Sequence, residues 1–407
     1  MSSSPQSTTV PRRRRIVHGL RRFRYAVLLL IVALVAAVAG CAGVQEADSN
    51  GHTNGPEVEI TDVLGRKVTV HVPSARILVD GSRYLYTTAL LNKDNPVDRI
   101  VGWPKDLQDN DPGTLETYKQ KFPQIADIPT IGDLYDGSFS VEQAIRLRPD
   151  VFIASASSFQ AAQDAGTIDK LAKAGIPTVV LDYFVDPIKN TVASVELLGK
   201  LMDRETEAAN FTTYYRSAVD GVRKRLDAAK QPPTPTFLWR APGYFECCSS
   251  FAKSNLAAIV DYAGGKNLAD DLLPGQQGSL SPETILSRNP QVVIATGAAW
   301  SPDTPAAPGS FVPLGYDQDH AKSQEQLRAV VDRQVGFSGL SAVRDHRTFV
   351  AWHHFYDSPY NFLAIQWFAK WMHPDLFADD DPDADFRALH EKFLPIAPTG
   401  TFWADLP

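Results

Sequence analysis

The sequence predicts an α/β protein of two lobes, each built on a mostly parallel sheet. Short β-branched runs alternate with helical patterns before residue 187, and the same alternation resumes after residue 232. One continuous helical pattern separates the two regions. Strands that alternate with helices form parallel sheets whose faces the helices cover. A chain of 407 residues is also too long for one compact core and long enough for two such lobes.

The first forty residues have the pattern of a secretion signal. Seven arginines without an acidic residue are followed by an apolar run at 25–39, which is shorter than the roughly 20 residues of a membrane-spanning helix. The run ends in Val-Ala-Gly-Cys, the pattern of a bacterial lipobox, in which cleavage leaves Cys41 as the lipid-modified first residue. An uncleaved anchor helix is the alternative. We therefore expect a signal peptide at 1–40, a flexible tether at 41–56, and an extracytoplasmic protein anchored to the bacterial cell membrane by lipid.

The charge of the remaining chain is strongly acidic. The full sequence has a net charge of −7, and loss of the seven leader arginines changes this to −14. A body of this charge does not suit nucleic acid or broad contact with an anionic membrane surface. We therefore expect neither as a partner, apart from the lipid anchor itself.

The N-terminal lobe, residues 57–186, begins with a predicted hairpin. Two alternating apolar runs flank Leu64 and Gly65, which is the pattern of two short strands joined by a tight turn. Buried strands and short helices are then expected to alternate. The strands are predicted at 76–80, 99–103, 128–133, 150–155 and 176–183, and the helices at 141–148 and 167–175.

Residues 187–231 are helical in pattern throughout and are expected to contain the helix between the lobes. Apolar residues recur there at spacings of three and four, which indicates one buried face. Three prolines within 231–236 end the pattern. The stripe consists of Ala208, Phe211, Tyr215, Ala218, Val222 and Leu226.

The C-terminal lobe, residues 232–407, repeats the α/β pattern. An irregular, proline-rich stretch is expected at 301–324. A partial duplication indicates that the two lobes are related. Residues 138–155 and 279–296 each contain a serine and a glutamate, followed by a short apolar helix, a proline and a buried strand. The strands of this lobe are predicted at 236–241, 291–297 and 348–354, and the helices at 255–265, 358–377 and 383–394.

Several landmarks occur in a characteristic order behind the lipobox: TDVLGRKVTV, the duplicated serine–glutamate units, LAKAGIPTVVLD, AGGKNLA and LSAVRDHRTFVAW. With these, the chain resembles the ABC-importer substrate-binding lipoproteins that handle iron–siderophore complexes, haem and cobalamin. The resemblance implies two lobes joined by a long helix and a metal chelate bound in the cleft. It also implies a monomer without a cofactor of its own, which delivers an iron–siderophore or similar complex to a permease dimer.

The resemblance further implies a role for two glutamates. In this family one glutamate on each lobe docks into the permease, and the matching positions are Glu142 and Glu283. The alternative is that each is an ordinary acidic residue in the first turn of a helix, where the helix dipole favours it. Only docking explains why both lobes carry the glutamate at the same place.

Candidate ligand contacts follow from the rule that open α/β sheets bind ligands at the carboxyl ends of their strands. Aromatic faces suit an organic chelate or macrocycle, and arginines suit carboxylates or an anionic ferric complex. For each aromatic residue taken singly, packing in the core remains an alternative. The rule selects Arg83, Tyr84, Trp103, Tyr135, Arg240, Tyr244, Phe245, Trp300, His353, His354 and Tyr356.

A site for a bare metal ion is not expected. Adjacent histidines on a strand point to opposite faces, so we expect one of His353 and His354 to enter the cleft and the other to be buried. A directly bound metal needs three or four convergent ligands, and the sequence shows no such set. Whether either histidine or Tyr356 completes the coordination of a chelated metal is left open.

Cys247 and Cys248 are adjacent, in the stretch that follows the first strand of the second lobe. With Cys41 acylated, no third cysteine remains for a thiolate metal site, and no base is evident for a nucleophile. A vicinal disulfide or two packed thiols remain, on a turn that shapes the cleft. Three alternative functions also stay open: binding of haem or cobalamin, envelope signalling without transport, and a cysteine-dependent enzyme.

Overall fold

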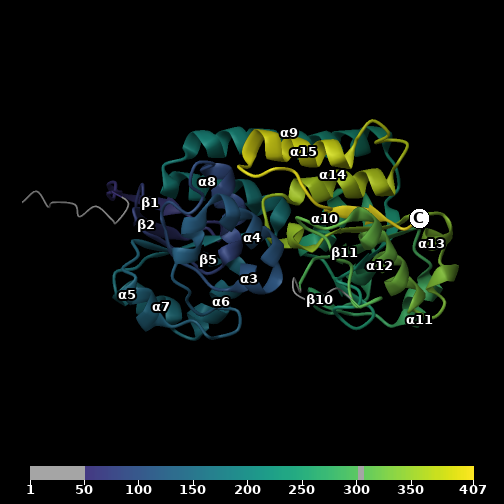
Figure 1. The fold of residues 1–407 in the computed structure, drawn as a ribbon, viewed down its shortest axis with the longest axis horizontal. Helices are drawn as coiled ribbons and strands as arrows, with labels where there is room; N and C mark the ends of the chain where they lie inside the picture. The colour runs from purple at the N-terminus through teal and green to yellow at the C-terminus, as the bar shows by residue number, and fades with distance from the viewer. Residues whose placement is uncertain (1–50, 301–306) are drawn as a thin grey trace, which may run out of the picture. The chain divides into compact units, whose positions relative to one another are not determined.

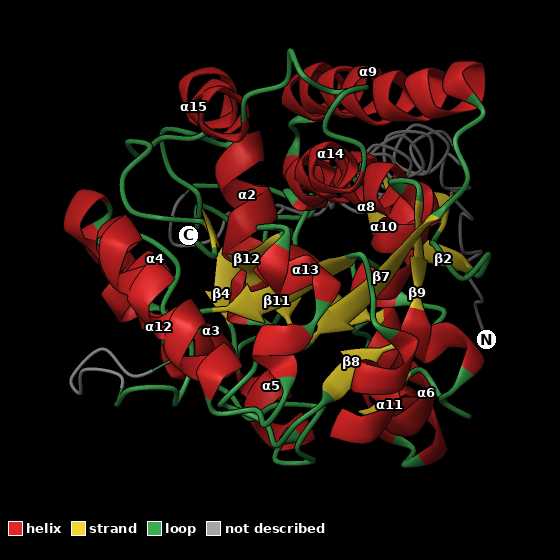
Figure 2. Cartoon of the chain, turned by 90° about the vertical axis from the view of Figure 1, so that its right-hand side faces the viewer, coloured by secondary structure: helices red, strands yellow, loops and turns green. Residues whose placement is uncertain are grey.

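A computed structural model describes residues 51–300 and 307–407. The expected signal peptide, Cys41 and most of the tether lie outside the described residues. Residues 51–300 and 307–407 form one compact unit with two main sheets that are mostly parallel. Helices pack around the strands (Figure 2), so the predicted α/β class is confirmed. Within the described ranges no helix is both long and apolar enough to cross a membrane.

The N-terminal lobe opens with the predicted hairpin, in which β1 (Glu57–Thr61) pairs with β2 (Lys67–His71). Its main sheet has the strand order β4-β3-β5-β6, and every pairing is parallel. The side chains of β3 alternate between two apolar clusters, because successive residues of a strand face opposite sides of the sheet. The strands are β3 (Ile77–Val79), β4 (Ile100–Gly102), β5 (Val151–Ser155) and β6 (Thr178–Leu181).

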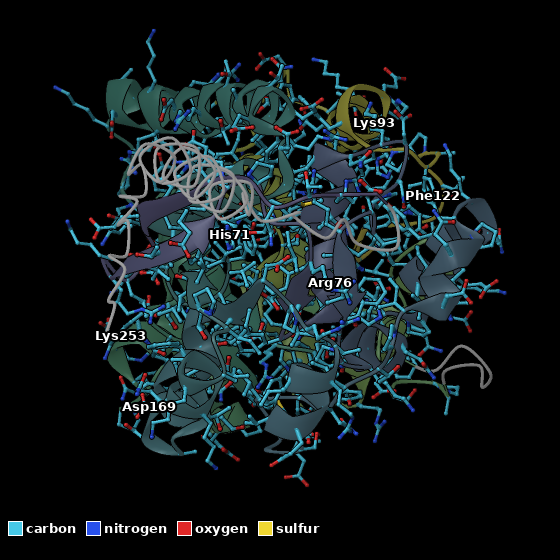
Figure 3. The ribbon with its side chains drawn as sticks, turned by 90° about the vertical axis from the view of Figure 1, so that its left-hand side faces the viewer. His71, Arg76, Lys93, Phe122, Asp169 and Lys253 are labelled. Atoms are coloured by element: carbon cyan, nitrogen blue, oxygen red, sulfur yellow. A yellow bond between two sulfur atoms is a disulfide. The ribbon has the colours of Figure 1, made fainter. Side chains whose placement is uncertain are left out.

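Arg76 ties the start of this sheet to the loop before β5 (Figure 3). Its backbone N–H donates to the carboxylate of Asp150 at 2.8 Å, and its guanidinium donates to the carbonyls of Leu147 and Arg148. The helix α5 (Val141–Arg146), which carries Glu142, is therefore fixed to the sheet through its C-terminal end. The other helices of the lobe are α2 (Leu85–Leu91), α3 (Asp106–Asn110), α4 (Pro112–Lys121), α6 (Ala156–Asp164) and α7 (Thr167–Lys173), with 3-10 turns η1 (Ser82–Tyr84) and η2 (Pro123–Asp127).

The strand predicted at 128–133 does not form. The segment makes a single bridge to the end of β4, in which Trp103 donates to the carbonyl of Pro129 and accepts from the N–H of Ile131. Pro129 lacks a backbone donor, and the chain then turns where Asp133 accepts the N–H of Tyr135 at 2.6 Å. The β-branched pattern of the segment is therefore not enough to extend the sheet.

The helical segment at 187–231 consists of two helices, α8 (Pro187–Met202) and α9 (Glu205–Ala229). Asp203 ends α8 in the left-handed conformation, with φ at 61°. Because the apolar spacing continues across this break, the sequence pattern reads as one helix. The buried stripe of α9 is Ala208, Phe211, Thr212, Tyr215, Val219, Val222 and Leu226, with Val219 in place of the predicted Ala218.

The C-terminal lobe has the strand order β13-β12-β11-β7-β9, with β13 antiparallel at one edge. A two-stranded ribbon of β8 and β10 lies outside this sheet. The proline-rich stretch is only partly irregular, because a helix begins at His320; residues 301–306 of it lie outside the described part. The strands are β7 (Thr234–Trp239), β8 (Ser249–Phe251), β9 (Gly265–Asn267), β10 (Gln277–Ser279), β11 (Val292–Gly297), β12 (Thr348–Trp352) and β13 (Trp403–Asp405).

The helices of this lobe cover its sheet and extend toward α9. In Figure 1, α14 and α15 lie beside α9 along the upper edge, and α14 packs against both α9 and α10. The helices are α10 (Asn255–Tyr262), α11 (Pro282–Arg288), α12 (His320–Asp332), α13 (Ser341–Arg344), α14 (Asn361–Met372) and α15 (Pro382–Phe393), with 3-10 turns η3 (Leu268–Asp271), η4 (Phe337–Gly339) and η5 (His353–Asp357).

One apolar core runs through both lobes. It includes Ile77 of the first sheet, Phe211 of α9 and Phe362 of α14, whose ring centroid lies 6.2 Å from that of Phe211. A contiguous, close-packed core resists large relative movements of the elements that share it. The two sheets are therefore carried on a common helical support.

The turn between α8 and α9 depends on a close approach that only glycine permits. A Cβ added at Gly199 would lie 2.6 Å from the Cβ of Ala208, whereas a Cβ added at Gly221 of α9 would meet nothing within 4 Å. We expect Gly199→Ala to lower the free energy of unfolding by about 1–2 kcal/mol through overpacking. Gly221→Ala is expected to raise it by about 0.5–1 kcal/mol, because alanine favours the helix. Urea unfolding measures both, and a Gly199→Ala protein more stable than the unchanged one would contradict this packing.

Candidate functional site: a cleft between the lobes

A cavity of about 760 Å³ lies between the two sheets, at the carboxyl ends of their strands. Its wall includes ten of the eleven predicted contacts. The exception is Trp103, which is buried in the core of the N-terminal lobe beside the bridge to Thr130. The ten are Arg83, Tyr84, Tyr135, Arg240, Tyr244, Phe245, Trp300, His353, His354 and Tyr356.

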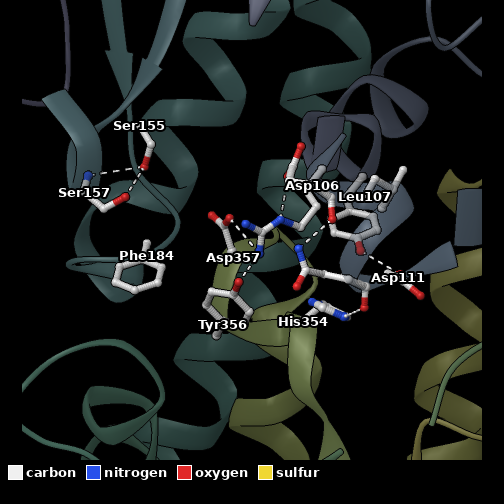
Figure 4. A network of polar contacts seen from close by, with 12 residues as sticks. Asp106, Leu107, Asp111, Ser155, Ser157, Phe184, His354, Tyr356 and Asp357 are labelled. Atoms are coloured by element: carbon white, nitrogen blue, oxygen red, sulfur yellow. Dashed lines mark hydrogen bonds and ion pairs between the residues drawn. The ribbon is translucent and has the colours of Figure 1, made fainter. Parts of the chain in front are cut away.

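Arg83 links the lobes across the floor of this cavity. Its Nε lies 2.8 Å from Asp106 of the N-terminal lobe, and its Nη1 lies 3.4 Å from Asp357 of the C-terminal lobe. The same Nη1 donates to the hydroxyl of Tyr356. Figure 4 shows Asp106 of α3 and the adjacent Tyr356 and Asp357 of η5 converging on this point. Because its charge is already balanced by two carboxylates, Arg83 is not free to pair with an anionic ligand.

Asp106 is in turn held in position by the start of η1. Its Oδ1 accepts the backbone N–H and the hydroxyl of Ser82, both at 2.6 Å, and the Ser82 hydroxyl accepts the N–H of Leu107. A buried carboxylate with several donors and a cation is fully satisfied. Ser82 follows β3 and Asp106 follows β4, so the segments after these two neighbouring strands together hold the side chain of Arg83 in position.

Aromatic rings form a platform on the C-terminal side of the cavity. The ring centroids of Tyr244 and Trp300 are 4.5 Å apart, and Trp300 also contacts His353 at 5.4 Å. Tyr135 stands across from them on the N-terminal lobe, with 82% of its side chain exposed. Large exposed aromatic rings around a cavity are suited to cover an apolar ligand surface.

Arg240 lies against the same platform. Its guanidinium carbon is 4.1 Å from the ring centroid of Phe245 and 4.9 Å from that of Phe251. Burial lowers its pKa from the usual value, and the phenol groups of Tyr356 and Tyr135 oppose that effect. Its Nε is buried and makes no hydrogen bond within the described ranges.

The two histidines differ from their sequence prediction. The strand β12 ends at Trp352, and both histidines lie in the 3-10 turn η5, so the alternation of a strand does not apply to them. Both are buried and both line the cavity. His353 Nδ1 is 2.8 Å from the hydroxyl of Thr296, and His354 Nε2 donates to the carbonyl of Asn110 across the lobes at 2.9 Å.

Burial keeps these histidines uncharged. It lowers the pKa of His354 to about 3, helped by the nearby Arg83, and it lowers the pKa of His353 well below its ordinary value. His354 Nδ1 makes no hydrogen bond within the described ranges. No group of three histidine, cysteine or carboxylate residues is arranged to hold a metal ion in the part of the chain that the structure describes.

Four carboxylates of the cavity were not predicted from the sequence: Asp80, Asp106, Asp133 and Asp357. Asp80 directly follows β3, so the strand-end rule already pointed to its position. Carboxylates do not fit the aromatic and basic site that a chelate was expected to need. Burial raises the pKa of Asp80 to about 7 and that of Asp357 to about 6, although Arg83 opposes the shift of Asp357.

The cysteine pair lies behind the wall of the cavity. The chain turns after Arg240, and the N–H groups of Tyr244 and Phe245 donate to the carbonyl of Ala241. The structure joins Cys247 and Cys248 in a disulfide, with Cys248 fully buried. The pair does not line the main cavity, whereas the two aromatic residues before it do.

Glu142 and Glu283 occupy equivalent places in the two lobes. Each lies in the first turn of its helix, after a serine, Ser140 or Ser281, that caps the helix through its hydroxyl. Both carboxylates are fully exposed, and hydrogen bonds from the backbone and from the capping serine lower the pKa of each. In Figures 1 and 2 the helices α5 and α11 both lie at the lower edge, opposite α9.

Comparison with known proteins identifies the family. A model described as periplasmic binding protein matches residues 98–351, which is more than half of the chain. The chain belongs to this family. The members bind their substrates and are not enzymes, so no catalytic role is assigned to the cysteines.

Two similar proteins agree with this assignment. A Bacillus subtilis protein described as an uncharacterized ABC transporter substrate-binding lipoprotein, YvrC, is 22% identical over 329 residues, which are 80% of this chain and 88% of that protein. The crystal structure of the TroA-like periplasmic binding protein FepB from Veillonella parvula is 28% identical, with a TM-score of 0.76, and covers 86% of this chain and 100% of its own. Both similarities support the assignment of this chain to the periplasmic binding protein family.

More distant structures share the fold. Molybdate-bound MolA of Haemophilus influenzae is 19% identical with a TM-score of 0.59, over 84% of this chain and 99% of its own. The nickel–histidine complex of CeuE from Helicobacter pylori is 16% identical with the same TM-score, over 84% of this chain and 96% of its own. The two-lobed architecture is therefore common to proteins whose ligands differ widely.

Loss of the Arg83 cation is expected to destabilise the binding protein in a pH-dependent way. Arg83→Met leaves the Asp106 and Asp357 carboxylates uncompensated, which costs about 3 kcal/mol of the free energy of unfolding. Without Arg83 the pKa of Asp357 rises further above its unfolded value, so the folded variant binds more protons than the unfolded chain. The variant therefore regains stability as the pH falls from 8 to 5.

Chemical denaturation at several pH values measures this loss. Arg216→Met, at an exposed ion pair with Glu196, is the control and should change stability by less than about 1 kcal/mol. A loss for Arg83→Met that is small, or that does not shrink at low pH, would contradict the proposed charge balance.

Proposed function

We propose that this periplasmic binding protein captures an iron–siderophore or similar metal chelate outside the cytoplasm and delivers it to its permease. The observation that carries the proposal is the cavity of about 760 Å³ with aromatic rings on both sides. Pockets of about 300–1,000 Å³ hold organic ligands of drug size. The described residues offer rings and hydrogen-bonding groups rather than a set of metal ligands, which suits a metal that arrives already chelated.

The location and anchoring belong to the same proposal. The lipobox and the acidic mature chain favour a protein that is lipidated at Cys41 and held at the outer side of the cell membrane. The similarity to a Bacillus subtilis lipoprotein supports this view. Haem and cobalamin, the alternatives from the sequence, are flat or macrocyclic complexes that the aromatic platform would also suit, so they belong in the same binding test.

Binding is tested by tryptophan fluorescence, since Trp300 lies in the cavity wall. A panel of ferric hydroxamates, ferric catecholates, haem and cobalamin is titrated, and at least one member is expected to quench the signal with a saturating curve. Tyr135→Ala should weaken that affinity about tenfold, because one stacked aromatic ring contributes about 1–2 kcal/mol, without loss of stability.

Leu64→Ala, at an exposed apolar residue of the hairpin turn away from the cavity, should change neither affinity nor stability. The proposal fails if no chelate of the panel binds. The assignment of the aromatic wall fails if Tyr135→Ala and Leu64→Ala have the same affinity as the unchanged protein.

Delivery is proposed to use Glu142 and Glu283. Both are exposed, anionic and placed at one edge of the molecule, so a pair of basic pockets on a permease dimer would be complementary to them. Charge reversal to arginine at both positions should reduce uptake by cells that lack their own copy of the protein at least tenfold. The affinity of the purified protein for the chelate should stay unchanged.

Glu205→Arg is the matched control, since Glu205 is also an exposed glutamate in the first turn of a helix, but at the opposite edge. It should leave uptake intact. Uptake that survives reversal of both Glu142 and Glu283 would contradict docking, and would favour the alternative of a binding protein used for envelope signalling.

A further inference from the structure

We infer that the cleft selects chelates of neutral or positive overall charge and discriminates against anionic ones. This inference rests on the proposed function and adds the charge class of the substrate. It follows from an imbalance in the cavity wall, where four carboxylates face two arginines: Asp80, Asp106, Asp133 and Asp357 against Arg83 and Arg240.

Two of the carboxylates have only neutral partners. Asp80 Oδ2 accepts the N–H of Ser155 and the hydroxyl of Ser158, each at 2.7 Å. Asp133 Oδ1 accepts the N–H of Tyr135 at 2.6 Å. Neither forms an ion pair with any residue of the described ranges. Both come from the N-terminal lobe, so that side of the cavity presents uncompensated negative charge to a ligand.

The two arginines do not offset this charge. Arg83 is shared between Asp106 at 2.8 Å and Asp357 at 3.4 Å, so that cluster contains one cation and two carboxylates. Arg240 is stacked on Phe245 and Phe251 and forms no ion pair with the described residues. Arg240 therefore supplies one positive charge, whereas the opposite wall carries the two unpaired carboxylates of Asp80 and Asp133.

The other titratable groups of the wall add no positive charge. His353 and His354 are neutral in the folded protein, because burial lowers the pKa of both. Burial, with a smaller contribution from the neighbouring Asp133 and Asp357, raises the pKa of Asp80 to about 7. A cationic ligand would reduce the electrostatic repulsion among these carboxylates, whereas an anionic ligand would add to the repulsion.

The arrangement also assigns an orientation. A positively charged substituent of the chelate is attracted toward Asp80 and Asp133 on the N-terminal lobe. The apolar body of the chelate then lies on the platform of Tyr244 and Trp300, with Arg240 beside it. The attraction acts in a partly desolvated cavity, where charge interactions are several times stronger than in water.

The test uses three linear ferric trihydroxamates that share one iron centre and differ in a terminal amine. The amine is free and positively charged in the first, acetylated and neutral in the second, and succinylated and negatively charged in the third. At pH 7.5 the free amine should bind at least as tightly as the acetylated chelate. The succinylated chelate should bind about tenfold more weakly than the neutral one, as expected for one unit of like charge near the wall.

Amino-acid substitutions in the cavity wall test whether its charge, and not its shape, determines the preference among the chelates. Asp133→Asn and Asp80→Asn keep the size of the side chain and remove its charge. In each variant, the ratio of the affinity for the positive chelate to the affinity for the negative chelate should fall several-fold. Asp220→Asn, at an exposed aspartate of α9, should leave the preference unchanged. Circular dichroism and thermal unfolding confirm that each variant is folded.

The outcomes distinguish this inference from the proposed function. Tighter binding of the succinylated chelate, or binding of haem or a ferric tris-catecholate in place of the trihydroxamates, would overturn the charge selection and leave chelate capture intact. A preference that persists unchanged in both asparagine variants would also overturn it. Failure of every chelate, cobalamin included, would overturn the proposed function and this inference together.

Discussion

The arrangement of the cleft depends on the charge contacts of Arg83. This residue lies in the 3-10 turn η1 after the first strand of the N-terminal sheet, and it meets Asp106 on its own lobe and Tyr356 and Asp357 on the other. Buried charges are stable only when their partners are close and the remaining groups are hydrogen-bonded, so these contacts fix the two lobes against each other at the floor of the cavity. The aromatic rings and the unpaired carboxylates are then held around a space of defined size. We propose that the selection among chelates follows from Asp80 and Asp133, the carboxylates of the cavity wall that no cation pairs with among the described residues.

The packed helices that support both sheets restrict how far the two lobes can move apart. A single apolar core joins the first sheet, α9 and α14, and the contact of His354 with the carbonyl of Asn110 adds a polar link between the lobes. A hinge made of packed helices bends less readily than one made of loops. We therefore expect ligand entry to involve the exposed rings at the mouth of the cavity, such as Tyr135 and Tyr244, more than a wide opening of the lobes.

Much of the fold and part of the site could be predicted from the sequence, since both depend on local patterns. Apolar periodicity located the hairpin, most of the parallel strands and the stripe of α9, and the strand-end rule selected ten residues that line the cavity. The errors share a cause, which is that tertiary contacts decide between equivalent local patterns. Trp103 follows a strand but packs inward, and His353 and His354 continue a strand pattern but lie in a 3-10 turn. The pairing of Arg83 with two carboxylates joins residues far apart in the chain, which no local pattern reveals.

We propose that a chelated metal binds between the lobes, against the aromatic platform and within reach of the acidic wall. Anomalous X-ray scattering at the iron absorption edge detects the metal in crystals grown with a neutral ferric trihydroxamate. The strongest anomalous peak is expected inside the cavity bordered by Asp133, Arg240 and Tyr356. An iron peak outside this cavity, or iron bound directly by protein side chains without its chelator, would show that the chelate does not bind in this way.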